Sequence, residues 1–162
     1  MKQKLFETGN DWIGFIGRVA LGLLILPHGL QKAFGWFNGY GFEGTMGFLT
    51  ETIGLPWILG AFIIFTEVAG SLLLVLGLLS RFWALMVICI MFGTIFTYHG
   101  PVGFFMNWDG NLKGEGYEYH LAVSAIALMV LINGAGRYSI DRIIGSRQAD
   151  PGKASAAQRA MA

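Results

Sequence analysis

Long apolar stretches alternate along the chain with segments that are rich in glycine and aromatic residues. Each stretch is near the length of about 20 residues that a helix needs to cross a hydrocarbon core of about 30 Å. The third stretch begins at Arg81, immediately after the second, which predicts a tight antiparallel hairpin between these two helices. The pattern therefore predicts four membrane-spanning helices, over residues 11–34, 55–79, 81–98 and 118–134.

The first helix gathers its strongly polar residues on one narrow stripe. Arg18, His28 and Lys32 are linked by steps of three and four residues, so they share one helical face. A charge at bilayer depth costs about 2.5 to 3.5 kcal/mol on insertion scales, and such residues usually face a bundle interior or a water-filled cavity. Pro27 removes a backbone hydrogen bond next to His28 and predicts a kink there. We therefore expect this stripe to line the working surface of the protein.

The second and third helices each add candidates to the same interior. Glu67 shares a face with glycine and serine residues, which allow close helix approach, so we expect it to point inward. His99 ends the third helix, and Phe92 and Phe96 precede it at helical spacing. This column predicts an aromatic wall for a flat ligand, although core packing alone would explain it equally well.

The fourth helix carries two candidates on opposite sides. Glu118 and His120 lie about 200° apart around the helix axis, because successive residues turn by about 100°. Both cannot face one centre, and we expect Glu118 to do so. A rise of about 1.5 Å per residue places both at the outer surface with His28, Lys32 and His99, which predicts one polar layer there.

Some of these residues also have a purely structural interpretation. Arg18 and Glu67 are each a lone charge at membrane depth, so we expect them to form a buried ion pair between the first two helices. Lys32 has a long stem that would allow its ammonium group to extend to the lipid headgroups. The histidines near helix ends would serve equally well as solvated or capping residues.

The composition makes lipid the expected solvent. The chain is 54% hydrophobic and only 13% charged, with a mean hydropathy of +0.57, which leaves too little polar surface to coat a soluble globule of 162 residues. A net charge of +1 without a basic stripe argues against a nucleic-acid partner. The predicted fold class is an all-α membrane protein, a four-helix bundle in the cell membrane with aromatic and glycine-rich outer loops.

The distribution of basic residues predicts the orientation of the bundle. Lysines and arginines concentrate near both ends of the chain and at the hairpin, on the side opposite the loops 35–54 and 99–117. Since positive charge favours the cytoplasmic side, we expect both termini to be cytoplasmic. Residues 1–145 would form the membrane domain, and residues 146–162, which have almost no large apolar side chains, would form a disordered tail.

Several short motifs occur in a fixed order along the chain. They are HGLQKAFG at 28–35, EVAG at 67–70, LGLLSR at 76–81, His99, GYEY at 116–119 and GAGRYSID at 134–141. In the order and spacing of these motifs, from about Arg18 to Asp141, the chain resembles the DoxX family of small membrane proteins. The resemblance implies four membrane helices. It also implies a link to quinones, because related small subunits belong to a thiosulfate:quinone oxidoreductase.

The leading functional hypothesis is a component of a quinone-linked oxidoreductase with an outward-facing polar pocket. In this pocket, His28 and His99 would form hydrogen bonds with the two carbonyl oxygens of a quinone or a similar flat redox ligand. Lys32 would stabilise developing negative charge, and Glu67 or Glu118 would relay protons. Whether the chain is itself an enzyme stays open at this level.

The sequence contains no CxxC or CxxCH motif, and its GxGxxG stretch at 39–44 follows an apolar helical stretch rather than a strand, so the sequence predicts no flavin, iron–sulfur centre or thiolate metal site of its own. Electrons would then pass through a soluble or membrane-bound partner subunit. One alternative is a b-haem cytochrome with His28 and His99 as axial ligands. Another is a membrane scaffold or accessory subunit whose polar contacts specify assembly, and self-association into a homo-oligomer is open in each case.

Overall fold

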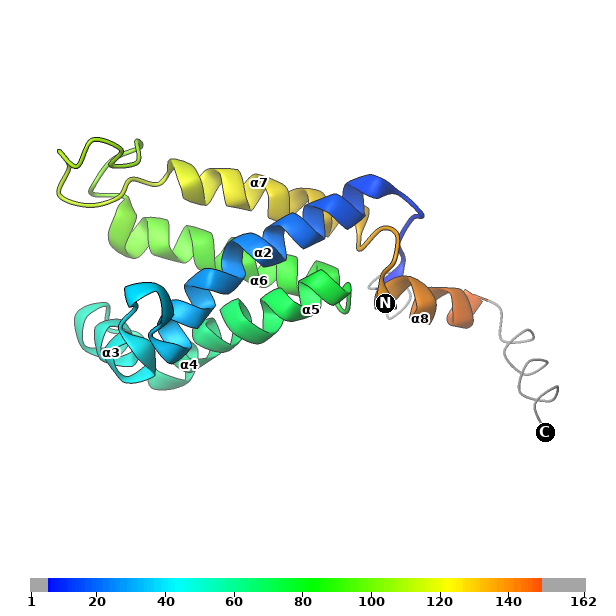
Figure 1. Ribbon diagram of the computed structural model, residues 1–162, viewed down its shortest axis with the longest axis horizontal. Helices are drawn as coiled ribbons and strands as arrows, with labels where there is room; N and C mark the ends of the chain where they lie inside the picture. Colours follow the sequence, from blue (N-terminus) through cyan, green and yellow to red (C-terminus); the bar gives the residue numbers. More distant parts are fainter. Residues whose placement is uncertain (1–5, 150–162) are drawn as a thin grey trace.

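The computed structural model of the protein describes residues 6–149, and within that range every regular element is helical. Four helical segments run side by side, each antiparallel to the one before it (Figure 1). The predicted four-helix membrane bundle is therefore confirmed. The four segments are α2 (Trp12–Phe34), Trp57–Leu76, Ser80–His99 and α7 (Glu118–Asn133).

The second and third segments are not uniform α-helices, and short helices cover both ends of the bundle. The second segment consists of α4 (Trp57–Phe65), the π-helical turn η3 (Thr66–Gly70) and α5 (Ser71–Leu76), and the third consists of α6 (Ser80–Thr94) and the π-helical turn η4 (Ile95–His99). One end is covered by the 3-10 turn η1 (Trp36–Asn38), α3 (Gly41–Gly47) and the π-helical turn η2 (Phe48–Thr52), and α8 (Ile140–Ala149) lies at the other.

Helix α8 includes residues 146–149, the first four residues of the tail that the composition predicts to be disordered. This helix, begun at Ile140 with an acidic residue in its first turn, continues through these four positions, and the disorder of the tail stays a prediction. The remainder of the predicted tail lies outside the described residues.

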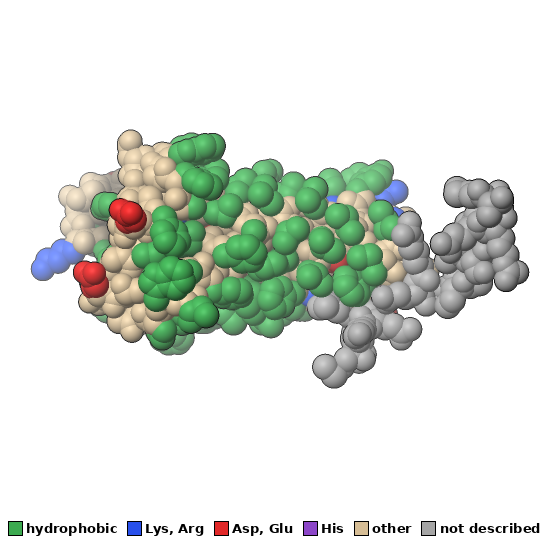
Figure 2. Space-filling view, turned by 90° about the horizontal axis from the view of Figure 1, so that it is seen from below, with side chains coloured by type: hydrophobic (Ala, Val, Ile, Leu, Met, Phe, Trp, Pro, Cys, Tyr) green, Lys and Arg blue, Asp and Glu red, His purple; other side chains and the backbone are tan. Residues whose placement is uncertain are grey.

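Length and apolarity fit three of the segments to a membrane span. Trp12–Phe34, Trp57–Leu76 and Ser80–His99 are 23, 20 and 20 residues long, whereas α7 is an apolar helix of 16 residues. On the face shown in Figure 2, hydrophobic side chains cover the middle of the bundle and charged side chains lie toward its two ends. An apolar girdle between polar ends is the surface that a protein presents to a bilayer.

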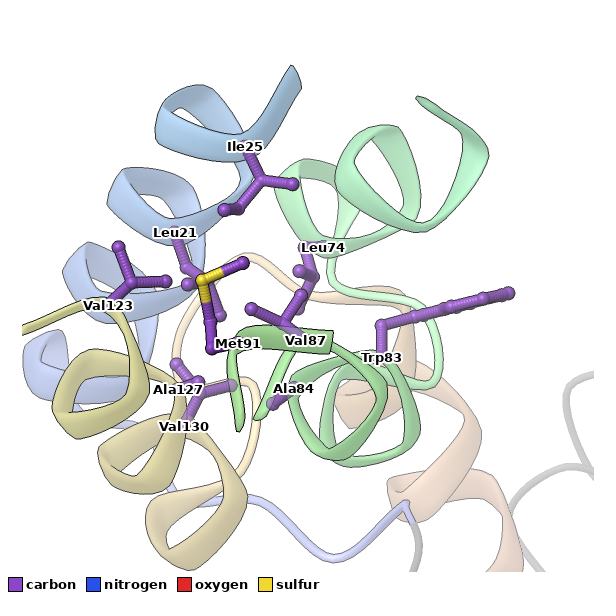
Figure 3. Packing of buried hydrophobic residues seen from close by; sticks show 10 residues of the cluster. All are labelled: Leu21, Ile25, Leu74, Trp83, Ala84, Val87, Met91, Val123, Ala127 and Val130. Carbon is purple, nitrogen blue, oxygen red and sulfur yellow. The ribbon is translucent and has the colours of Figure 1, made fainter. Parts of the chain in front are cut away.

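The core lies where α2 packs against α5 and α7, and where α6 packs against α7 (Figure 3). Two glycines of α2 allow the closest of these approaches. A Cβ atom on Gly22 would lie 2.7 Å from the carbonyl oxygen of Ser71, and one on Gly29 would lie 2.6 Å from that of Glu67. Backbone therefore packs on backbone between α2 and the second segment, as small residues permit in membrane bundles. The core consists of Leu21, Ile25, Leu74, Trp83, Ala84, Val87, Met91, Val123, Ala127 and Val130.

At the end beside α8, here named the closed end, Arg18 is 1% exposed and donates to backbone carbonyl groups. The expected ion pair between Arg18 and Glu67 is therefore wrong. The last carbonyls of a helix lack intrahelical partners, and a guanidinium has five N–H donors with which to satisfy such groups. The acceptors are Ala135 at 2.8 Å from Nε, Leu74 at 3.1 Å and Val75 from Nη1, and Arg137 at 3.1 Å and Tyr138 at 2.8 Å from Nη2.

Asp141 completes the closed end by capping α6. Its carboxylate accepts hydrogen bonds from the backbone N–H groups of Leu79, at 2.7 Å, and Ser80, at 2.9 Å. Its own N–H donates to the carbonyl of Gly77 at 2.9 Å. Arg18 and Asp141 thus join the chain that follows α7 to the hairpin between α5 and α6. The 134–141 motif serves the fold at this point.

Candidate functional site

A cavity of about 340 Å³ lies between the helices at the end opposite α8, here named the cavity end. Its volume is within the range of about 300 to 1,000 Å³ that small-molecule sites occupy. Residues of α2, α4, α6, η3, η4 and α7 form its walls, and residues of α3, η2 and the loop before α7 also contribute. The lining includes the polar residues His28, Lys32, Thr45, Glu67, Thr94, Thr97, Tyr98, His99, Glu115, Tyr119 and His120, and the apolar residues Ile25, Ile63 and Met91.

All three histidines of the chain line this cavity, each from a different helical segment. The rings of His99 and His120 lie against each other, with centroids 4.1 Å apart. Nδ1 of His99 lies 2.8 Å from the carbonyl oxygen of Glu115, which favours a proton on Nδ1 and leaves Nε2 as an acceptor. His28, His99 and His120, which the depth estimate places in one outer layer, thus line one cavity.

His120 is the functional candidate that the sequence analysis rejected. Its side chain is 8% exposed, and Nδ1 has no hydrogen-bond partner among the described residues. Buried polar atoms in folded proteins are nearly always hydrogen-bonded, so an unpartnered nitrogen in a residue of the cavity lining makes His120 a candidate for contact with a bound molecule. His120, Val123, Ala127 and Val130 recur at steps of three and four residues and are all buried, but the other faces of α7 are also apolar, so this spacing alone could not have identified His120.

Glu118 lies on the other side of α7, so the choice between Glu118 and His120 is corrected. Its Oε1 accepts a hydrogen bond of 3.2 Å from Nε1 of Trp108, in the loop before α7, and Glu118 does not line the cavity. Glu118 is the residue that reaches solvent and His120 is the one that is buried, because burying an ionised carboxylate costs more than burying an imidazole.

Lys32 and Glu67 form an ion pair at the cavity, with 2.6 Å between Nζ and Oε2. The Glu67 side chain is 4% exposed and that of Lys32 is 31% exposed. Gly29, one turn before Lys32, brings the backbone of η3 against α2, so the carboxylate lies within reach of the lysine. Glu67 therefore points inward as expected, but its partner is Lys32, and Lys32 does not extend to the headgroups.

Tyr119 connects α7 to the histidine on α2. Its hydroxyl group lies 3.3 Å from Nε2 of His28, and the two rings have centroids 5.8 Å apart. Consecutive residues at the start of α7 thus approach histidines on two different helices, Tyr119 toward His28 and His120 toward His99. Tyr119 belongs to the GYEY motif, and no sequence pattern predicts its role at the cavity.

The aromatic column of the third helix does not line the cavity. Phe92 is 41% exposed and Phe96 is 80% exposed, so the predicted aromatic wall for a ligand is wrong. The buried side of α6 is the one that carries Val87 and Met91, and Phe92 and Phe96 lie away from it on the apolar surface that faces lipid. Their rings, 6.4 Å apart, pack on each other there.

Irregular helical turns coincide with the cavity. The π-helical turn η3 carries Glu67, η4 carries His99, and η2 contributes Phe48 and Leu49. A π-helical turn contains an extra residue, changes the direction of the side chains that follow, and often marks a functional site. Such irregular backbone is tolerated at membrane depth where protein surrounds it or where it lines a cavity.

A second hollow, of about 500 Å³, adjoins the cavity beneath α3. It shares Lys32, Thr45, Phe48 and Tyr98 with the cavity, and its other lining residues belong to the end of α2 and the segment that follows it. The two hollows together lead from the surface of the cavity end to the histidines. A molecule in the cavity would thus be held by polar groups of several helices and reached from this end.

Fold and site together define a class: a small four-helix membrane protein with a polar cavity between its helices at one end. The chain belongs to the DoxX family, whose model matches residues 13–100. This range contains His28, Lys32, Glu67 and His99 and ends before α7.

A curated relative aligns over a longer part of the chain. The chain is 28% identical over 113 residues to the inner membrane protein YqjF of Escherichia coli (strain K12), which covers 70% of this chain and 82% of that protein. No solved structure matches the chain with significance.

Proposed function

We propose that this protein is a component of a quinone-linked oxidoreductase and that the cavity binds a quinone or a similar flat redox molecule. The observation that carries the proposal is the convergence of the three histidines and the Lys32–Glu67 pair on one cavity. The name of the Escherichia coli relative supports a location in the inner membrane. The basic residues at the closed end support an orientation with both termini in the cytoplasm and the cavity facing outward.

The lining residues fit a quinone head in both size and chemistry. A flat ring with an oxygen at each side needs hydrogen-bond partners on both sides and apolar contacts on its faces. There are two polar pairs in the cavity, His28 with Tyr119 and His99 with His120, and α7 supplies one member of each. The apolar lining would contact the faces of the ring. An isoprenoid tail would lie in the lipid or between the apolar helices.

The residues at the cavity divide into groups that bind and groups that hold a proton. A bound quinone supplies the ability to take up or release electrons together with protons. His28 and His99 would form hydrogen bonds with its oxygens, and the Lys32 ammonium would stabilise negative charge there. Glu67 would hold a proton, and His120, in the place that was predicted for Glu118, would both form a hydrogen bond with the quinone and hold a proton. Electrons would come from a partner subunit.

The identity of the bound molecule tests the proposal directly. The protein is purified in a mild detergent, its visible spectrum is recorded, and its bound small molecules are extracted for mass spectrometry. We expect a co-purified quinone and no haem absorption. A strong haem band would support the b-haem alternative, and the absence of both would support a scaffold.

Quinone affinity of variants tests the site itself. His99→Ala should weaken binding of an added quinone about tenfold, the factor that corresponds to the loss of one hydrogen bond of about 1.4 kcal/mol. Phe96→Ala is the matched control, because Phe96 lies three residues earlier and faces away from the cavity. Equal affinities in His99→Ala and the wild type would remove His99 from the site.

A further inference from the structure

A cluster of exposed aromatic rings lies at the closed end. Trp12, Phe15 and Tyr138 have ring centroids 5.6 to 6.1 Å apart. Trp12 is 51% exposed and Tyr138 is 70% exposed. Trp and Tyr in membrane proteins favour the level of the lipid headgroups, since their rings are apolar and their edges carry a polar group. The cluster therefore marks the headgroup level at this end of the bundle.

Arg137 is held on this cluster without an anion. Its guanidinium carbon lies 4.7 Å from the centroid of the Trp12 ring and 5.7 Å from that of Tyr138. The Arg137 backbone is fixed by a hydrogen bond of 3.0 Å from its N–H to the carbonyl of Asp11. Its side chain has no hydrogen-bond or carboxylate partner among residues 6–146. A guanidinium stacked on aromatic rings with free N–H groups is preorganised to bind a phosphate.

Arg142 lies on the same part of the chain. Its guanidinium donates a hydrogen bond to Oδ1 of Asn10, two residues before Trp12. Arg142 also lines a surface hollow of about 520 Å³, together with Tyr138 and two serines. Neither Arg137 nor Arg142 forms an ion pair among the described residues. The nearby carboxylates are engaged elsewhere, because that of Asp11 accepts from the N–H of Gly14 and that of Asp141 is buried as the cap of α6.

We propose that the closed end binds the headgroup of an anionic phospholipid, with Arg137 and Arg142 on its phosphate. Two unneutralised arginines at headgroup level favour an anionic lipid over a zwitterionic one. A lipid is favoured over a soluble phosphate because Ile13 and Ile16, on the first turns of α2, are 56% and 60% exposed and offer an apolar path for an acyl chain. This site is separate from the cavity and does not depend on the function proposed for it.

Lipid retention by the purified protein tests the proposal. The protein in mild detergent is incubated with phosphatidylglycerol or with phosphatidylcholine, and native mass spectrometry counts the retained lipids. We expect the wild type to retain phosphatidylglycerol preferentially. Arg137→Gln and Arg142→Gln should each lower this retention about fivefold. Lys113→Gln, which removes a positive charge from the loop at the cavity end, should leave it unchanged.

Three results would overturn the proposal. They are equal retention of the two lipids by the wild type, retention that neither arginine variant lowers, and displacement of the lipid by millimolar inorganic phosphate, which would indicate a soluble anion as the ligand. Arg142→Gln keeps the test decisive if Arg137→Gln fails to fold, because the one hydrogen bond that the Arg142 guanidinium forms within the described part of the chain goes to the side chain of Asn10. Arg137→Lys should restore part of the retention lost in Arg137→Gln, since it restores the charge without the planar fork.

Discussion

The two ends of the bundle use buried polar residues in opposite ways. At the closed end, Arg18 and Asp141 are each 1% exposed, and their side chains are hydrogen-bonded to backbone groups. At the cavity end, His120 is 8% exposed with an unpartnered nitrogen, and the Lys32–Glu67 pair borders an open volume. A polar group satisfied by backbone stabilises the fold, whereas one left unsatisfied beside a cavity is available to a ligand.

The two ends also differ in helix geometry, which is regular at the closed end and irregular at the cavity end. Near the closed end the second segment is the regular helix α5, whose last carbonyls accept from Arg18. At the cavity end the second and third segments contain the π-helical turns η3 and η4. Tight backbone closure at one end thus holds the helices while irregular turns at the other direct polar side chains into a cavity. Each of the following predictions tests one side of this contrast.

Removing Arg18 should give the largest loss of stability. Arg18→Met leaves several buried carbonyl groups without a donor, and we expect a loss of about 3 to 5 kcal/mol in the free energy of unfolding. Unfolding by titration with a denaturing detergent measures it. Arg142→Met, at the exposed surface of the same end, should change stability by less than about 0.5 kcal/mol. A similar small effect for Arg18→Met would show that the closed end does not hold the bundle.

Gly29 tests whether the helix approach that positions Glu67 is tight. A Cβ atom there would lie 2.6 Å from the carbonyl oxygen of Glu67, so Gly29→Ala should cost about 1 to 3 kcal/mol. Gly93→Ala is the matched control, because its Cβ atom would meet nothing within 4 Å and alanine favours a helix over glycine. Gly93→Ala should be neutral or stabilising. Equal effects of the two variants would mean that α2 and η3 separate easily.

A double-mutant cycle distinguishes the observed partner of Glu67 from the expected one. Lys32→Met and Glu67→Gln should be non-additive in the free energy of unfolding by about 1 to 2 kcal/mol, because their side chains are in contact. Arg18→Met and Glu67→Gln should be additive, since within residues 6–149 the Arg18 guanidinium donates hydrogen bonds to backbone carbonyls and forms no ion pair with Glu67. The reverse pattern would restore the ion pair that the sequence suggests.

The sequence predicts the spans and most of the cavity, because both depend on periodicity and depth along single helices. His28, Lys32 and His99, which periodicity and depth place together, line the cavity, and so does Glu67, for which periodicity predicts the inward face but depth predicts a deeper layer. The ion pair between Glu67 and Lys32 was not predicted, because depth was estimated from the rise per residue along straight helices. That estimate does not include the length of the lysine side chain. The position of Arg18 depends on where the chain returns after α7, and no single-helix pattern contains that information.

The choice between Glu118 and His120 failed for a different reason. Helix α7 is apolar on nearly all sides, so hydrophobic periodicity does not define its buried face. The face is set by packing against α2 and α6, which buries Val123 and Ala127. The aromatic column of Phe92 and Phe96 was misplaced likewise, because a membrane helix places aromatic side chains against lipid as readily as in a core.

His120 gives the smallest expected effect on stability and tests the cavity end most directly. His120→Ala should change the free energy of unfolding by about 1 kcal/mol or less, because the nitrogen that it removes is unpartnered in the described structure. It should nevertheless weaken quinone binding about tenfold, as expected for the loss of one hydrogen bond to the ligand. Glu118→Ala, two residues earlier and outside the cavity lining, should leave that affinity unchanged. Affinity is measured by titrating a quinone into the purified variants and following tryptophan fluorescence. If Glu118→Ala weakens binding and His120→Ala does not, the ligand is held on the other side of α7 and the cavity is not its site.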